Sequence, residues 1–317
     1  MHETPSHRSS KPPRVAVIGA GAMGSIFGAA CIDAGADTVF VDVSAPLVER
    51  LQERGLVIVG PDGEREVPVR ATTDPHSVGV VDLILFLVKC YQTESAARLA
   101  KTLVGPETIV TSLQNGWGNG EVLGRFFPDE QIVVGVTYDS GTVLEPGRIA
   151  HNYKGTTFIG PYAGESLDDA RWIADLLAPA GLGVVATPTI RAAIWEKLVM
   201  TASTLPTSAL TGLTSGALGE PGPMLDLVDG LALETLETAR AAGYELEAAE
   251  QLEKIRLALV GEGKGSMLQD VEAGRQTEIA VINGAVVREA EARAVDVPLN
   301  RAMVALVEGY ERAHGFA

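Results

Sequence analysis

The chain has few of the features that mark membrane, nucleic-acid-binding or disulfide-stabilised proteins. Its 317 residues include only two cysteines, Cys31 and Cys90, which are too few for a disulfide framework and belong to no metal-type cluster. Cations are scarce as well: 25 Lys and Arg against 41 Asp and Glu give a net charge of −16, which repels phosphate backbones. The longest apolar run, 78–88, is interrupted by Asp82 and is too short to span a membrane. We therefore expect no nucleic-acid partner and no membrane partner.

Aromatic residues make up only 5% of the chain, whereas 46% of its residues are hydrophobic, so Ala, Val and Leu must supply most of the packing. This composition excludes disorder as the main state, and the length suits about two domains of ~150 residues each. The polar start, 1–13, lacks the apolar core of a signal peptide and is predicted to be a flexible tail. The sequence thus favours a soluble, cytoplasmic protein.

Short β-branched runs alternate with helical segments from Arg14 to about Thr187. Strands are expected at 14–18, 38–41, 82–88 and 108–112, a helix at 23–34, and late strands and turns over 140–160. The unalternating apolar residues of 82–88 indicate a strand that is buried on both faces, as in a parallel sheet covered by helices. We therefore predict an α/β fold with a Rossmann-type doubly wound sheet over 14–188.

The chain changes character near Pro188, after which the strand signals disappear. Apolar residues then recur at near-helical spacing, at Leu225, Val228, Leu231 and Leu236 and again at Ile279, Ile282, Val286 and Val287. We therefore predict an all-α domain over 189–317, which would hold the substrate and form the contacts of a homodimer.

A glycine-rich turn, GAGAMG, joins the first predicted strand to the first predicted helix. Gly19 permits a tight turn, Gly21 lets the backbone approach a pyrophosphate, and Gly24 lets the helix pack closely on the strand. The N–H groups at the helix start, at Ala22 and Met23, are available to the anion. Together these features predict a dinucleotide-binding turn. The alternative is a glycine-rich turn that binds no dinucleotide.

An acidic residue follows the second predicted strand. Asp42 lies 18 residues after Gly24, where a carboxylate can accept hydrogen bonds from the ribose of a dinucleotide. Enzymes that use NADP usually place Arg or Lys just after this strand, and here no cation occurs before Arg50. Since a carboxylate repels a 2′-phosphate, we expect NAD(H) to be favoured over NADP(H).

Five motifs, in order along the chain, resemble those of the ketopantoate reductase family: GAGAMGS (19–25), VKCYQT (88–93), QNG (114–116), WEKL (195–198) and SMLQDVEAGRQTEI (266–279). The similarity extends from about Arg14 to the C-terminus, and the last motif is the most specific. The resemblance implies a Rossmann domain followed by a helical domain, with the active site in the cleft between them. It also implies reduction of a 2-oxo acid to a 2-hydroxy acid with a nicotinamide cofactor, typically NADPH.

Reduction of a ketone requires a proton donor for the oxygen on which negative charge develops. Lys197 lies in the apolar stretch IWEKLVM, where partial burial would lower its pKa and aid proton donation. The resemblance implies that Lys197 is the general acid; the alternative is an ordinary solvated lysine. The resemblance also implies that Glu278, expected in the helix after SMLQD, orients the lysine and the substrate. The alternative is a surface ion pair between Glu278 and Arg275.

Three further residues are assigned to ligand binding by the resemblance. Ser266 would bind the substrate carboxylate, Asn115 would contact the substrate and the nicotinamide half of the cofactor, and Lys89 would lie near both ligands. Taken alone, Ser266 is equally a helix N-cap, Asn115 a turn residue and Lys89 a solvated lysine.

Two positions depart from the family pattern, which commonly reads K-L-x-x-N-x-x-x-N-P. Here Thr201 and Leu205 replace the two asparagines, on the same helix face as Lys197. Thr201 keeps a hydroxyl that can reach the substrate, whereas Leu205 can make no hydrogen bond. We therefore expect 2-oxo acids with branched or aromatic side chains to match or exceed ketopantoate as substrates. The alternative is that Leu205 only fills a neighbouring layer of the helical domain.

Two other functions stay open: an NAD-dependent D-2-hydroxy-acid or opine-type dehydrogenase, and a dinucleotide-sensing regulator with no activity. A regulator would usually carry a partner module such as a basic recognition helix, and the sequence has none. The five histidines form no catalytic triad or ligand cluster, so no metal site is expected and His151 is assigned no chemistry.

Overall fold

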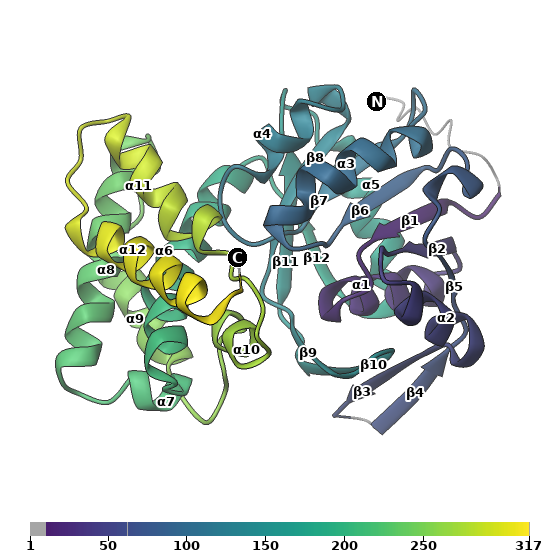
Figure 1. Cartoon of the computed structure of the whole chain (residues 1–317). Helices are drawn as coiled ribbons and strands as arrows, with labels where there is room; N and C mark the ends of the chain where they lie inside the picture. The colour runs from purple at the N-terminus through teal and green to yellow at the C-terminus, as the bar shows by residue number, and fades with distance from the viewer. Residues whose placement is uncertain (1–10, 62, 317) are drawn as a thin grey trace. The chain divides into compact units, whose positions relative to one another are not determined.

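The computed structural model describes residues 11–61 and 63–316, so most of the tail predicted at the N-terminus lies outside the described residues. Two compact units make up the chain (Figure 1). The first contains the residues up to Gln114 together with Gly120–Ile190, and the second contains Asn115–Asn119 together with the chain from Arg191 onward. Within the described part of the chain, no helix is both long enough and apolar enough to cross a membrane.

An eight-stranded sheet forms the centre of the first unit, in the order β12-β11-β8-β7-β6-β1-β2-β5. Its strands are β1 (Arg14–Ile18), β2 (Asp37–Val41), β5 (Arg70–Thr72), β6 (Leu83–Phe86), β7 (Ile109–Ser112), β8 (Ile132–Thr137), β11 (Thr156–Pro161) and β12 (Gly183–Ala186). All neighbours run parallel except β8 and β11. Every residue of β6 is fully buried, so this strand is covered on both faces, as its apolar run predicts. The predicted α/β fold with a doubly wound sheet is confirmed.

The α-helices of the first unit are α1 (Ala22–Asp33), α2 (Ala45–Arg54), α3 (Thr93–Ala100), α4 (Asn119–Gly124) and α5 (Asp168–Leu177). The chain passes from β1 through α1 to β2 on one side of β1, and β6 lies on the other side. The strand order therefore reverses between β1 and β6. In open α/β sheets, the carboxyl ends of the strands at such a reversal are where ligands bind.

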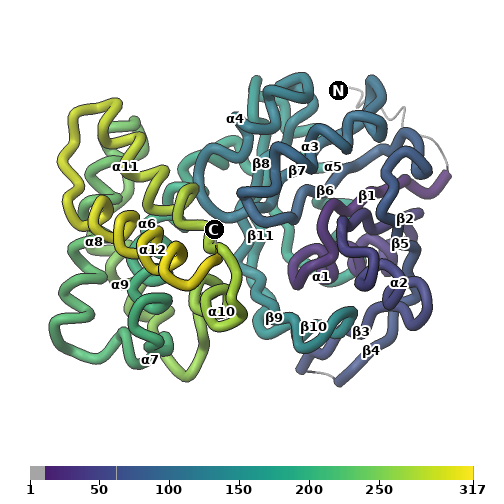
Figure 2. Tube along the Cα trace, in the orientation of Figure 1, coloured from purple at the N-terminus to yellow at the C-terminus, as the bar shows by residue number. Residues whose placement is uncertain are grey.

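Four strands form a second sheet. Two of them lie in the stretch 140–160, where late strands were expected, whereas the other two and the sheet itself were not predicted. The four strands are β3 (Leu56–Gly60), β4 (Gly63–Val67), β9 (Ser140–Glu145) and β10 (Arg148–Tyr153), in the order β4-β3-β10-β9 (Figure 2). Strand β9 packs on α1. A Cβ atom at Gly141 would lie 2.6 Å from Ile26 Cδ1 and 3.5 Å from Ala22 Cβ, so the close approach of strand and helix requires glycine.

A buried polar network lies where the chain passes between the two sheets. His151 Nε2 is 2.8 Å from Asp139 Oδ1, and Asp139 Oδ2 accepts hydrogen bonds from the hydroxyls of Thr137 and Thr157. Thr137 and Thr157 belong to the large sheet and His151 to the small one. The network therefore holds the two sheets together, and this contact was not foreseen for His151.

The second unit is helical, as predicted. Its elements are α6 (Ile190–Thr211), α7 (Ser215–Leu218), α8 (Pro223–Ala241), α9 (Ala248–Ala258), α10 (Ser266–Glu272), the 3₁₀-helix η6 (Ile279–Val281), α11 (Asn283–Glu291) and α12 (Pro298–His314). Helix α8 contains the first apolar repeat noted in the sequence, and the second repeat spans η6 and α11.

Helix α6 carries Pro206 in its interior. Proline has no N–H group, so the carbonyl of Ala202, four residues earlier, loses its helical partner. Asn283 Nδ2 donates a hydrogen bond to this carbonyl at 2.8 Å and another to Asn300 Oδ1 at 3.0 Å. The contact joins α6 to α11 and α12 and so fixes the helix that carries Lys197.

Candidate active site

The predicted site residues fall into two groups, one in each compact unit. The first unit contains Gly19, Gly21, Ala22, Met23, Gly24, Asp42 and Lys89, and the second contains Asn115, Lys197, Thr201, Ser266 and Glu278.

The glycine turn after β1 combines two tightly packed positions with one open position. Gly19 has a φ of +97°, and a Cβ atom there would lie 2.9 Å from Val88 Cγ1, in the loop that follows β6. A Cβ atom at Gly24 would lie only 1.9 Å from the carbonyl oxygen of Gly19. At Gly21, by contrast, no atom lies within 4 Å of such a Cβ. The turn therefore excludes side chains at Gly19 and Gly24 and leaves space for a ligand at Gly21.

Helix α1 begins with Gly21 at its N-cap, without a side-chain hydrogen bond to the cap and without an acidic residue in its first turn. The N–H groups of Ala22 and Met23 have no acceptor within the helix because of their position in the first turn. Together with the positive end of the helix dipole, these groups form an anion-binding terminus. The residues of this turn thus fit the pyrophosphate of a dinucleotide.

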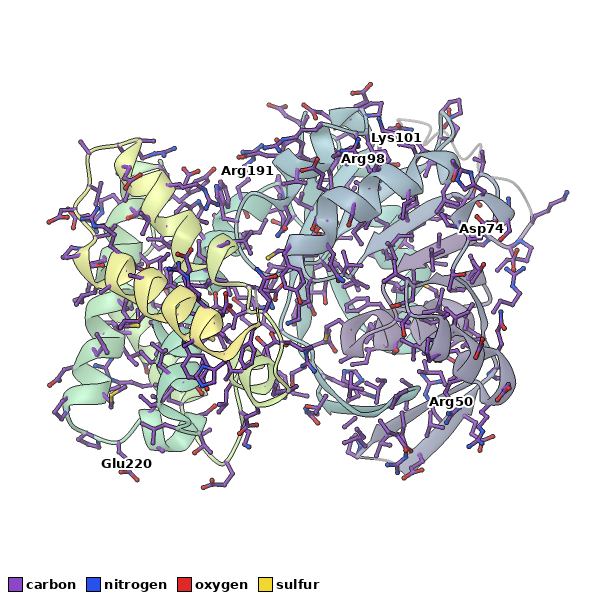
Figure 3. The ribbon with its side chains drawn as sticks, in the orientation of Figure 1. Arg50, Asp74, Arg98, Lys101, Arg191 and Glu220 are labelled. Atoms are coloured by element: carbon purple, nitrogen blue, oxygen red, sulfur yellow. The ribbon has the colours of Figure 1, made fainter. Side chains whose placement is uncertain are left out.

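Asp42 follows β2, and backbone N–H groups hold its carboxylate in place. Asp42 Oδ2 accepts a hydrogen bond from Ala20 N at 2.8 Å, and Oδ1 accepts one from Ser44 N at 2.9 Å. The carboxylate is therefore fixed beside the glycine turn. Arg50, the next cation in sequence, lies in α2 (Figure 3), and its guanidinium group donates a hydrogen bond to Gly55 O, just after that helix, at 3.4 Å.

Lys89 lies half-buried after β6, as the N-cap residue of the 3₁₀-helix η2 (Cys90–Gln92). The neighbouring loop is held by Gln114, which follows β7. Gln114 Nε2 donates hydrogen bonds to Val88 O at 2.8 Å and to Thr93 Oγ1 at 2.7 Å. In the sequence, Gln114 is only the first letter of the QNG motif, which does not reveal this structural role.

Asn115 joins Lys197 to Glu278. Lys197 Nζ donates a hydrogen bond to Asn115 Oδ1 at 2.9 Å, and Asn115 Nδ2 donates one to Glu278 Oε2 at 3.4 Å. Glu278 is buried, whereas Lys197 and Asn115 are half-buried. We call these three residues the polar row. The structure thus brings together both residues predicted to be catalytic and the asparagine predicted to bind cofactor and substrate.

Glu278 does not lie in a helix, and the prediction that it does is wrong. Helix α10 ends in a Schellman turn, in which Gly274 has a φ of +66° and the N–H of Arg275 donates to Asp270 O at 2.9 Å. The side chain of Arg275 then pairs with Asp270 Oδ1 at 3.0 Å, instead of with Glu278 as the alternative supposed. Gly274 was the available sequence signal for the end of this helix.

Glu278 is instead positioned by the turn between α10 and η6. It is the N-cap residue of η6, and the preceding residue is anchored to α12, because Thr277 N donates a hydrogen bond to Glu311 Oε1 at 2.7 Å. Glu311 is buried although it carries a carboxyl group. Glu311 supports the backbone next to the polar row, and no motif in the sequence points to it.

The hydroxyl group of Thr201 is turned back onto its own helix. Thr201 Oγ1 donates to Lys197 O at 3.0 Å and to Leu198 O at 3.3 Å. The hydroxyl proton is therefore used within α6, and only the oxygen lone pairs can meet a substrate.

Leu205 is buried in the core of the second unit. A Cβ atom added at Gly265 would lie 2.8 Å from Leu205 Cδ2, so Leu205 packs closely on the backbone there. This packing agrees with the alternative that Leu205 fills a neighbouring layer of the helical domain. Ser266 begins α10 and is half-buried, but the N-cap residue is Gly265. The alternative that Ser266 is the N-cap is therefore wrong.

Comparison with known proteins covers both units. The family model "Ketopantoate reductase PanE/ApbA" matches residues 15–164, and "Ketopantoate reductase PanE/ApbA C terminal" matches residues 189–311. The 2-dehydropantoate 2-reductase of Archaeoglobus fulgidus is 33% identical over 299 residues, covering 94% of this chain and 98% of that protein.

Two solved structures show the same similarity. A D-mandelate dehydrogenase with NADH and anilino(oxo)acetate has a TM-score of 0.91 and 25% identity, covering 96% of this chain and 100% of that one. A PanE/ApbA family ketopantoate reductase from Ralstonia eutropha has a TM-score of 0.86 and 30% identity, covering 95% of this chain and 99% of that one. With both family models matched and a similarity that spans nearly the whole length, this chain belongs to the ketopantoate reductase family.

Proposed function

We propose that this chain reduces a 2-oxo acid to the 2-hydroxy acid with a nicotinamide cofactor, and that Lys197 is the general acid. The observation that carries the proposal is the polar row, in which the amide of Asn115 joins the ammonium group of Lys197 to the buried carboxyl group of Glu278. The proposed reaction is the one named for the 2-dehydropantoate 2-reductases to which the chain is similar.

The cofactor supplies the hydride that reduces the ketone carbon. Lys197 meets the other requirement, a cationic donor for the oxygen on which negative charge develops. An ammonium group has three N–H donors, and the bond to Asn115 Oδ1 uses one of them to hold Nζ in place. Because Glu278 accepts a bond from the other side of the same amide, Asn115 cannot rotate without breaking both contacts.

We further propose that NADH is preferred over NADPH. The carboxylate of Asp42 is fixed by two backbone N–H groups at the place where Rossmann folds bind the ribose. At ~4 Å, it would oppose each phosphate charge by roughly 4 kcal/mol at an effective dielectric constant near 20, before screening. The next residue, Val43, is 76% exposed and brings no compensating cation. The similar D-mandelate dehydrogenase structures contain NADH.

For the substrate, we propose 2-oxo acids with branched or aromatic side chains. Thr201 has its hydroxyl proton bound within α6, so it donates no hydrogen bond to a hydroxyl group on a substrate. Leu205 lies in the core of the second unit and supplies no donor in place of the second asparagine of the family pattern. Mandelate, in the name of the similar dehydrogenase, is a 2-hydroxy acid with a phenyl group. The same similarity supports a D-2-hydroxy-acid dehydrogenase as the second candidate function.

The test is a substrate panel with the purified full-length chain. Ketopantoate, 2-oxoisovalerate and phenylglyoxylate are each supplied with NADH and with NADPH, and oxidation of the cofactor is followed by absorbance. We expect higher kcat/KM with NADH, and with at least one of the two apolar acids a value that equals or exceeds that for ketopantoate. A tenfold or larger advantage for ketopantoate would refute the substrate proposal, and equal or better use of NADPH would refute the cofactor proposal. Failure to oxidise either cofactor with any 2-oxo acid would refute the function.

We also propose that the chain acts as a homodimer in the cytoplasm. Light scattering on the eluate of a size-exclusion column tests the assembly, and a mass close to that of one chain would contradict it.

A further inference from the structure

The loop Asn115–Asn119 is attached to the second unit through Trp117. The backbone N–H of Trp117 donates a hydrogen bond to Val281 O, in η6, at 2.8 Å. Its indole Nε1 donates to Glu289 Oε1, in α11, at 3.0 Å, and Glu289 Oε2 pairs with Arg293 Nη1 at 2.7 Å. Backbone and side chain of one residue therefore bind the loop to two different elements.

The indole ring of Trp117 also packs against the helix that carries the proposed general acid. Its centroid lies 5.2 Å from that of Trp195 and 5.9 Å from that of Tyr244, the latter in an edge-to-face contact. Trp195 is fully buried and lies two residues before Lys197 in α6. Aromatic pairs in these geometries attract beyond the burial of their area, so the ring holds the loop against α6.

Gly116 transmits this anchoring to Asn115. It has a φ of +86°, and a Cβ atom there would lie 2.2 Å from Val281 O, so the loop backbone touches η6 closely. With only one tightly held residue between them, Asn115 and Trp117 cannot move independently. Trp117 thus belongs to the loop that carries Asn115, and it contacts both α6, which carries Lys197, and η6, whose N-cap residue is Glu278.

We propose that Trp117 is a positioning residue for the reaction, which sets the amide of Asn115 so that it holds Lys197 and reaches Glu278. The inference rests on the proposed function. The Lys197–Asn115 bond is 2.9 Å long, and a displacement of the amide by ~1 Å would take it beyond hydrogen-bond range. The role needs the indole as a whole, since the ring contacts Trp195 and the N–H contacts Glu289.

The test compares Trp117→Leu with Trp117→Phe, which keeps a ring but lacks the N–H. Leu259→Ala is the control, because Leu259 is buried in a separate core cluster of the same unit. We expect Trp117→Leu to lower kcat at least fivefold and Trp117→Phe to lower it less, with a smaller change in the calorimetric Kd for NADH. Leu259→Ala should lower the Tm but leave kcat within about twofold. If Trp117→Leu loses less than fivefold in kcat, or no more than the control, Trp117 has no positioning role.

A double variant shows whether the effect passes through the amide. In an Asn115→Ala background, adding Trp117→Leu should lower kcat by less than about a further twofold, because the amide that Trp117 positions is already absent. A full additional loss would mean that Trp117 acts by another route, and the proposal would be wrong.

Lysine labelling gives a readout that does not depend on turnover. Acetic anhydride acetylates Lys197 and Lys254, and mass spectrometry of the digested full-length protein gives the ratio of their rates. Lys254 is the internal reference, since it lies in the same unit and is paired with Glu196 and Glu250 instead of with Asn115. We expect Trp117→Leu to change the Lys197-to-Lys254 ratio at least threefold; an unchanged ratio would overturn the proposal. If the wild-type chain reduces no 2-oxo acid, the proposed function fails, and the labelling still decides whether Trp117 positions the row.

Discussion

At the scale of single residues, the amide of Asn115 makes two contacts of opposite kind, as acceptor toward Lys197 and as donor toward Glu278. A side-chain amide has a hydrogen-bond donor and an acceptor in one plane, whereas a carboxylate can only accept. An aspartate at this position would attract the lysine but face Glu278 as a second acidic group. The choice of asparagine therefore follows from the residues on either side of it.

Replacement of Lys197 tests the proposed proton donor directly. We expect Lys197→Ala to lower kcat by about 10²–10⁴-fold, the usual contribution of a positioned general acid. Affinity for NADH should stay near wild type, because the cofactor residues lie on other elements. Lys254→Ala is the matched control: it removes a lysine that pairs with Glu196 and Glu250, and kcat should change little. A loss of less than about fivefold in Lys197→Ala would show that another group is the acid.

The two cysteines should react very differently with iodoacetamide. Cys31 is fully buried in α1, and burial raises the pKa of its thiol from 9.0 to about 12, so the thiolate needed for alkylation is nearly absent at pH 8. Cys90 is only half-buried. At pH 8 we expect mass spectrometry to find Cys90 alkylated and Cys31 unmodified until urea unfolds the chain. Equal rates in the native protein would contradict the burial of Cys31.

At the scale of helices and strands, the sequence predicted those elements whose pattern is local. Strand β1, helix α1 and strands β2, β6 and β7 all occur within a few residues of their expected positions. The small sheet was missed as a sheet because β3 pairs with residues of β10 that lie 91 positions later (Val57 with Arg148), and no local pattern reports such a partner. Glu278 was placed in a helix because the Schellman turn at Gly274 was not recognised.

The sequence predicted the residues that would carry the chemistry of the candidate site, but it did not predict the residues that hold them in place. Lys197, Asn115 and Glu278 were named from motifs, and the structure brings them together. Their supports, Trp117 and Glu311, belong to no recognisable motif because they act through tertiary contacts, which a local sequence pattern does not report.

The glycine turn provides a matched pair of substitutions at the scale of one element. Gly24→Ala would place a methyl group 1.9 Å from Gly19 O, and since this atom is backbone, we expect a loss of at least about 1–3 kcal/mol in the free energy of unfolding. Gly21→Ala meets no atom within 4 Å and has an ordinary backbone conformation, so it should cost about 1 kcal/mol or less.

Of the two variants, Gly21→Ala should lose less stability but more affinity for the cofactor. The methyl group of Gly21→Ala would occupy the space in which we expect the pyrophosphate, and we expect the Kd for NADH to rise at least tenfold in calorimetry. Urea unfolding monitors stability in parallel. A Gly21→Ala variant that binds NADH like wild type would show that the cofactor does not approach this turn.

At the scale of the whole molecule, the second unit is not a continuous stretch of chain, because it includes Asn115–Asn119. This affects how domains can be exchanged between relatives. A chimera that takes only the part from Arg191 onward from the Archaeoglobus fulgidus relative separates Asn115 and Trp117 from the partners with which they occur. We expect its kcat to be lower than that of a second chimera that also takes the relative's loop 115–119.

The comparison of the two chimeras is made at equal NADH saturation, with the Tm as a check on folding. Equal kcat values would mean that the loop is interchangeable between relatives and carries no specific fit to the helices.

The small sheet has a consequence for the time during which the chain is synthesised. The hairpin of β3 and β4 is complete at Val67, but β10, which pairs with β3, begins only at Arg148. At about 5–20 residues per second, the intervening stretch of about 80 residues takes roughly 4–16 s to translate. Through this interval one edge of the apolar strand β3 has unpaired N–H and C=O groups, which can pair with a strand of another chain. Before β10 leaves the ribosome, the nascent protein can therefore aggregate through this edge, and a chaperone that binds extended apolar segments would protect it in those seconds.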